Sequence, residues 1–167
     1  MLSVAWTLSV GHADETWVIP TWQHAFDKQQ GASYEDRFAM CERAFVLLPG
    51  VKVLDIEKRL GGVSRTLHTL QALKESHPDT ELRLLIGADL LPTTDRWHRW
   101  DQVSELAPPI VVGRQGYEGG PVSSVAIPNI NSTDIRGAIS RGDDVQPWVP
   151  AEVLEYISAK GLYEGET

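Results

Sequence analysis

The chain has 167 residues, of which 42% are hydrophobic, and this predicts a single globular domain over residues 1–167 with a substantial core. A formal net charge of -8 without any basic run argues against a surface that binds nucleic acid. The only cysteine, Cys41, rules out a disulfide framework and favours a reducing, cytoplasmic location, and no apolar stretch is long enough to span a membrane.

Hydrophobic periodicity and turn residues predict alternating helices and strands along the chain. Helices are expected over residues 2–10, 34–47 and 64–75, from Ser132, and from Pro150 to about Ala159. Strands are expected over residues 16–19, 51–56, 82–86, 110–112 and 122–127, with a weakly helical, tryptophan-rich segment before Leu106. This alternation predicts an α/β fold with a doubly wound, mainly parallel sheet.

Residues 131–136 form the most informative run of the sequence. Asn131, Ser132 and Thr133 precede apolar periodicity, which predicts a capped helix start. Arg136 then lies in the first turn, where the helix dipole disfavours a cation unless a negative ligand shares that helix end. A phosphate bound by hydroxyls, free backbone N–H groups and the guanidinium fits this pattern. The alternative is an ordinary capped surface helix with Arg136 in water.

Polar residues follow the predicted strands at a recurring position. These residues are His24 and Lys28, then Ser64, Thr66 and Thr69, then Gly87 and Asp89, then Arg114, and finally Ser132 and Arg136. Because the carboxyl ends of parallel strands share one edge of an open sheet, where ligands bind, we expect these clusters to meet there. The pattern favours the phosphate interpretation of the helix that begins at Ser132.

Several of these residues have a simpler structural interpretation. His24 fits a surface histidine, and Asp89 fits a cap on the segment that follows. Trp97 and Trp100 are three residues apart and fit packing on one helix face, and we expect one ligand contact and one core residue. Arg37 fits a surface ion pair with neighbouring acidic residues on its own helix.

The motifs, in their order and spacing, resemble those of one enzyme family along nearly the whole chain. The matching segments are residues 14–20 with His24 and Lys28, Arg37 with Met40, Glu57 with Ser64, Thr66, Thr69 and Leu70, Gly87-Ala88-Asp89 with Trp97 and Trp100, and residues 131–136. The chain resembles bacterial nicotinate (nicotinamide) mononucleotide adenylyltransferases, within the Rossmann-like nucleotidyltransferase superfamily.

This resemblance implies adenylyl transfer from ATP to a pyridine mononucleotide, giving the dinucleotide and pyrophosphate in NAD biosynthesis. It implies that Ser132, Thr133, Arg136, Gly87 and Asp89 bind ATP. The implied substrate residues are Thr66 and Trp97 at the pyridine ring and His24, Lys28 and Arg114 at phosphate charge. Mg²⁺ is expected to arrive with ATP, and no protein metal site, nucleic acid or membrane partner is implied.

The sequence departs from the family pattern at its start. The family begins with a strand and a glycine-rich turn carrying two histidines, whereas Met1 already lies in the first predicted helix. We therefore expect the first strand to be absent, two strands to be left with a free edge, and the catalytic residues to lie upstream of Met1. Arg65 and His68 depart from the usual pattern as well, which leaves acid or amide specificity open. Another nucleotidyltransferase, such as one acting on phosphopantetheine, and an inactive nucleotide-binding paralogue are the alternatives.

Overall fold

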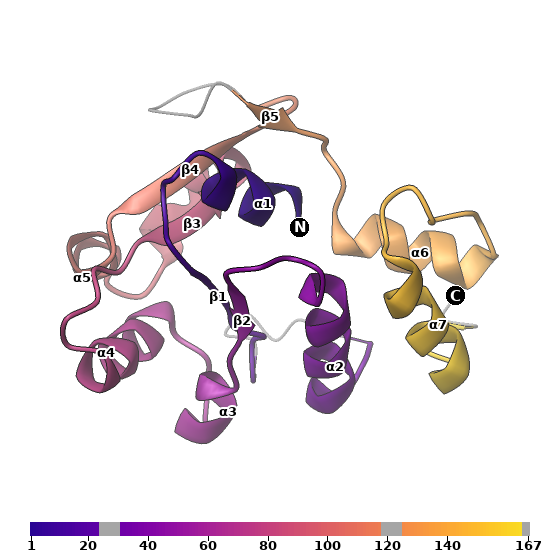
Figure 1. Ribbon diagram of the computed structural model, residues 1–167, viewed down its shortest axis with the longest axis horizontal. Coiled ribbons are helices and arrows are strands. Elements are labelled where there is room, and N and C mark those ends of the chain that lie inside the picture. The colour runs from indigo at the N-terminus through magenta and orange to yellow at the C-terminus, as the bar shows by residue number, and fades with distance from the viewer. Residues whose placement is uncertain (24–30, 118–124, 165–167) are drawn as a thin grey trace.

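The structure, a computed structural model, describes residues 1–23, 31–117 and 125–164, in which helices alternate with short strands (Figure 1). The helices are α1 (Leu2–Ser9), α2 (Tyr34–Phe45), α3 (Ile56–Leu60), α4 (Thr66–Ser76), the 3-10 helix η1 (Ala88–Arg96), α5 (Trp100–Leu106), α6 (Ser132–Arg141) and α7 (Ala151–Lys160). The strands are β1 (Thr16–Val18), β2 (Val51–Val53), β3 (Leu84–Gly87), β4 (Pro109–Arg114) and β5 (Ala126–Ile127). This order confirms the predicted α/β class. No described helix has the length and apolar character needed to cross a membrane.

All described strand pairs are parallel, as predicted, but they form two sheets. β1 pairs with β2, with Trp17 opposite Lys52. β3, β4 and β5 form the second sheet in that order, with Leu85 opposite Ile110. Within the described residues β1 pairs only with β2, and β3 pairs only with β4, so each of these two strands has one free edge.

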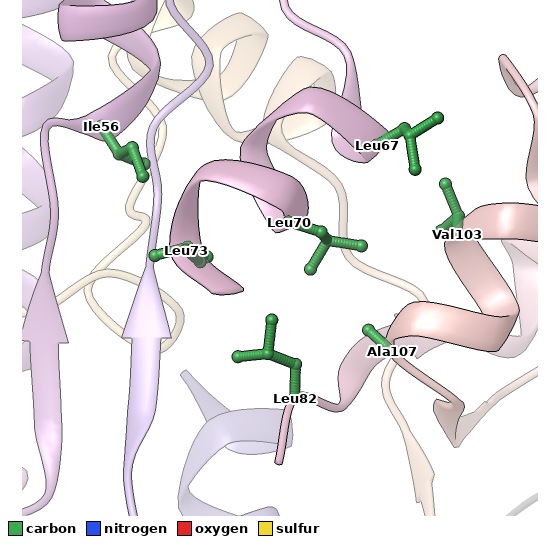
Figure 2. Packing of buried hydrophobic residues seen from close by; sticks show 7 residues of the cluster. All are labelled: Ile56, Leu67, Leu70, Leu73, Leu82, Val103 and Ala107. Atoms are coloured by element: carbon green, nitrogen blue, oxygen red, sulfur yellow. The ribbon is translucent and has the colours of Figure 1, made fainter. Parts of the chain in front are cut away.

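A shared hydrophobic cluster joins the two sheets. Leu67 and Leu70 of α4 point toward Val103 and Ala107 of α5, with Leu82 beside them (Figure 2). Trp17 of β1 and Leu84 of β3 pack against the same cluster, which also contains Ile56 and Leu73. Burial of these side chains contributes most of the stability at this end of the molecule, at about 1.5–3 kcal/mol for each large aliphatic group.

Some element boundaries differ from the predictions. The strand expected over residues 51–56 ends at Val53, because Ile56 begins the five-residue helix α3, which is too short to give a periodic signal. The tryptophan-rich segment divides into η1 and α5, separated by Arg99 in the left-handed region at φ 55°. Of the strand expected over residues 122–127, only Ala126–Ile127 is strand, and residues 122–124 lie outside the described ranges.

Candidate active site

Gly87 and Asp89 lie together at the carboxyl end of β3. A Cβ atom added to Gly87 would lie 2.4 Å from Asp89 Oδ1, so the carboxylate occupies the space that any side chain at this position would need. Asp89 Oδ1 is buried and has no hydrogen-bond partner among the described residues, and Asp89 Oδ2 accepts from Arg114. The glycine predicted from sequence to line a nucleotide cleft therefore also makes room for this carboxylate.

Arg114, at the end of β4, connects Asp89 to the segment that leads into α6. Its Nη1 donates to Asp89 Oδ2 at 2.7 Å, its Nε to Asn129 Oδ1 at 3.0 Å and its Nη2 to the Ile130 carbonyl at 2.7 Å. The Arg114 and Asp89 side chains are 16% and 20% exposed. We call Gly87, Asp89, Arg114, Asn129 and Ile130 the strand-end network. These contacts show that Arg114 positions residues 129–130. The predicted contact of Arg114 with a substrate phosphate stays a prediction.

Helix α6 begins at Ser132, as predicted, and Asn131 is its N-cap. Asn131 Oδ1 accepts from the Asp134 backbone N–H at 2.9 Å, and its Nδ2 donates to Asp134 Oδ2 at 2.6 Å. Arg136 Nη2 lies 3.4 Å from Thr133 Oγ1 on the same exposed helix end. Because Arg114 holds the Ile130 carbonyl directly before this cap, the strand-end network fixes where the free N–H groups of α6 lie.

Ser132 and Arg136 line a pocket of about 450 Å³ between α2, α6 and α7, which lie on one side of the molecule (Figure 1). We call it the α6 pocket. Its lining residues are Pro20, Thr21, Arg37, Met40, Cys41, Ala44, Ser132, Arg136, Trp148, Val149, Pro150, Val153 and Tyr163. None of these described residues is acidic, although the chain as a whole carries a net charge of -8. The pocket is thus apolar on its walls and cationic at two guanidinium groups.

Arg37, on α2, is the second guanidinium of this pocket. Its Nη1 donates to the Thr21 carbonyl at 2.7 Å, while its Nε is buried and has no hydrogen-bond partner within the part of the chain that the structure describes. Burial lowers the pKa of Arg37, yet an arginine side chain stays protonated at neutral pH. The alternative of a surface ion pair on α2 is wrong, because Glu35 pairs with Lys58 and Asp36 accepts from Ser33 and Tyr156.

Cys41 lines the same pocket one helical turn after Arg37. Burial raises the pKa of the Cys41 thiol, so the side chain is a neutral, weakly polar part of the wall at neutral pH. The charge of this pocket is therefore carried by Arg37 and Arg136.

Thr66 and Trp97 lie on neighbouring segments away from the α6 pocket lining. Thr66 is the first residue of α4, and Trp97 follows η1 and packs against the cluster of Ile86, Ala88 and Val111. The His68 and His98 rings, 5.9 Å apart, bring the two segments together. Trp97 and Trp100 both pack on this cluster, edge to face at 5.4 Å. They do not share one helix face, because Trp97 lies before α5 and Arg99, at φ 55°, separates it from Trp100. A pyridine contact at Trp97 stays a prediction.

The segment after β1 is attached to α3 and α4 through side chains of the predicted motif. Glu57 Oε2 accepts from the Trp22 backbone N–H at 3.0 Å, and Glu57 Oε1 accepts from Thr69 Oγ1 at 3.1 Å. Ser64 Oγ accepts from the Gln23 backbone N–H. These motif residues therefore hold Trp22 and Gln23 in place. The predicted substrate residues His24 and Lys28 lie outside the described ranges.

The comparisons with known proteins decide the family. The model for cytidylyltransferase-like proteins matches residues 2–138. A probable nicotinate-nucleotide adenylyltransferase from Anaeromyxobacter sp. (strain K) is 42% identical, over 99% of this chain and 89% of that protein. The chain belongs to the nicotinate-nucleotide adenylyltransferase family. A second relative with the same description, from Myxococcus xanthus, is 32% identical over 98% of this chain and 86% of that protein.

Solved structures of related enzymes share the fold of the chain. The nicotinic acid mononucleotide adenylyltransferase of Plasmodium falciparum complexed with NaAD superposes with a TM-score of 0.81 at 17% identity, over 97% of this chain and 88% of that chain. The same enzyme complexed with APC gives a TM-score of 0.78 at 16% identity, with the same coverage. These likenesses confirm the predicted Rossmann-like fold, and the sequence relatives confirm the family and its nucleotidyltransferase class.

Proposed function

We propose that this chain transfers the adenylyl group of ATP to nicotinate mononucleotide, giving the dinucleotide and pyrophosphate. The observation that supports it most directly is the α6 pocket, where Ser132, Arg136 and Arg37 face one space of about 450 Å³. Pockets of this volume hold ligands the size of a nucleotide. Family membership supplies the reaction class, and this pocket supplies a place for its polyanionic substrate.

The charges of the α6 pocket suit a triphosphate. Arg37 and Arg136 provide two guanidinium groups, each able to bind phosphate oxygens through paired N–H donors. The free N–H groups at the start of α6 and the Ser132 and Thr133 hydroxyls add neutral donors at the same helix end.

The chemistry needs positioning more than proton transfer. The attacking group is a phosphate oxygen of the mononucleotide, which is already ionised at neutral pH, so no protein side chain needs to act as a base. Holding this oxygen in line with the α-phosphorus of ATP lowers the entropic part of the barrier. Arg136 and Arg37 would stabilise charge that moves toward the leaving pyrophosphate, the role that fixed cations have in phosphoryl transfer.

We further propose that Mg²⁺ enters with ATP and is held mainly by phosphate oxygens and water. Within the described residues there is no group of three or more side chains suited to bind a metal ion, so this chain offers the ion few ligands of its own there.

Gly87 and Asp89 are proposed to meet the nucleotide at the strand ends. Thr66 and Trp97 are proposed to meet the pyridine ring, with Lys28, His24 and Arg114 near substrate phosphate. We propose a single-domain enzyme with a cytoplasmic location, which the lone cysteine supports.

A pyrophosphate-release assay tests the proposal. The chain is incubated with ATP and Mg²⁺ and with nicotinate mononucleotide, nicotinamide mononucleotide or phosphopantetheine in parallel. The proposal expects release with nicotinate mononucleotide, and a loss of that release in Arg136→Ala. Arg141→Ala is the matched control, because Arg141 lies at the other end of α6 in an exposed ion pair with Asp143. Release only with phosphopantetheine, or ATP binding without turnover, would contradict the proposal.

A further inference from the structure

Trp148 differs from the other tryptophans of the chain. All six tryptophans lie in the described residues, and Trp148 is the one whose side chain is exposed, at 53%. A large apolar ring left in solvent costs free energy that burial elsewhere would recover. An aromatic side chain exposed at the wall of a pocket is the arrangement that a flat ligand would cover.

A turn and two prolines restrain the backbone that carries Trp148. The Trp148 backbone N–H donates to the Val145 carbonyl at 3.0 Å, which closes a turn whose first side chain, Val145, is buried. Pro147 precedes the indole, and Pro150 ends the segment as the N-cap of α7. Because both prolines restrict the backbone, a ligand would order little additional chain on binding.

Trp148 lines the same pocket as Arg136 and Arg37. One space is therefore bounded by a flat aromatic surface, two guanidinium groups and the Ser132 end of α6. A ligand that matches all of these has a flat, uncharged ring at one end and several negative charges at the other. A nucleoside triphosphate has this construction, whereas inorganic phosphate lacks the ring.

We propose that Trp148 is the stacking surface for the adenine base of ATP, with the triphosphate at Arg136 and Arg37. This inference rests on the proposed function and extends it, since it assigns a specificity-determining residue that the sequence motifs do not contain. Stacking selects for the base and leaves the phosphate contacts unchanged, so the two ends of the pocket contribute to affinity separately.

The test measures the affinity of the full chain for ATP and for inorganic tripolyphosphate by calorimetry. Trp148→Leu is expected to weaken ATP binding about tenfold, within the range for loss of one base–aromatic stack, and to leave tripolyphosphate binding unchanged. Arg136→Ala is expected to weaken the binding of both ligands. Val10→Ala is the matched control, because Val10 is exposed to a similar extent, 49%, and does not line the pocket.

A conservative variant, Trp148→Phe, provides a second test if Trp148→Leu fails to fold. Trp148→Phe retains a stacking ring, so it should bind ATP within about threefold of the wild-type chain while losing the quenching of tryptophan fluorescence by ATP. Unchanged ATP affinity in Trp148→Leu would overturn the inference. So would an equal loss of tripolyphosphate binding, or weaker binding of nicotinate mononucleotide with ATP unaffected. If the wild-type chain binds no ATP at all, the proposed function fails together with the inference.

Discussion

Arg114 of the strand-end network and the two arginines of the α6 pocket, Arg37 and Arg136, differ in how their hydrogen-bond donors are used. In the strand-end network, all three side-chain nitrogens of Arg114 donate to protein groups, namely Asp89, Asn129 and the Ile130 carbonyl. Among the described residues, Arg37 Nε in the α6 pocket has no hydrogen-bond partner, and Arg136 makes one long side-chain contact, with Thr133. The difference separates a guanidinium group whose nitrogens all donate to the protein from two guanidinium groups whose nitrogens do not.

The strand-end network should carry the larger stability effect. Asp89→Ala leaves the half-buried guanidinium of Arg114 without its carboxylate, so we expect the free energy of unfolding to fall by about 2–4 kcal/mol in urea denaturation. The matched control is Asp143→Ala, which breaks an ion pair with Arg141 whose side chains are 65% and 53% exposed. That change should cost less than about 1 kcal/mol. Equal losses in the two variants would remove the distinction between the regions.

Gly87→Ala tests whether the carboxylate of Asp89 is the reason for the glycine. The new methyl group would meet Asp89 Oδ1 and shift the carboxylate whose Oδ2 accepts from Arg114. We expect a loss of about 1–3 kcal/mol in the same denaturation experiment. In an Asp89→Ala background this loss should largely disappear, since the obstructing atom is gone. If Gly87→Ala lowered the free energy of unfolding equally in both backgrounds, the Asp89 carboxylate would not be the reason for the glycine.

A hydrogen bond between α2 and α7, two of the helices around the α6 pocket, should show a smaller, pH-dependent effect on stability. Tyr156 on α7 donates to Asp36 Oδ1 on α2 at 2.8 Å, and hydrogen bonds from Ser33 and Tyr156 lower the pKa of Asp36. Because the pKa of Asp36 is lowered in the folded chain, the ionised carboxylate stabilises the fold at any pH above the ordinary aspartate pKa of 3.8. This stabilisation is lost as the pH falls through the lowered pKa of Asp36. Tyr156→Phe should therefore lower the melting temperature slightly at neutral pH, and the difference should vanish in acid. A difference that is constant with pH would contradict this assignment.

Local signals were sufficient to predict the start of helix α6. Asn131 caps α6 through a contact only three residues away, and the first turn of a helix follows from such short-range chemistry. The alternation of elements likewise predicted the α/β class, because each element carries its own periodicity. The family followed from motifs spread over the chain.

Long-range contacts explain what the sequence did not predict. Arg37 contacts the carbonyl of Thr21, 16 residues away, and Arg114 contacts Asp89, 25 residues away. Neither pairing leaves a periodic trace, so the sequence offers a surface ion pair as the simpler interpretation of Arg37 and gives no sign that Arg114 contacts Asp89. Trp148 carries no motif at all, and only its exposure on the pocket wall distinguishes it.

The central claim is that the α6 pocket binds the polyphosphate of ATP through guanidinium groups that the protein leaves available. Calorimetry of ATP binding to the wild-type chain and to Arg136→Ala tests it most directly, with circular dichroism to show that the variant is folded. We expect Arg136→Ala to weaken binding by about 1.5–3 kcal/mol, the usual range for a hydrogen bond to a charged group, or roughly 10–150-fold. An ATP affinity unchanged by this substitution would contradict the account.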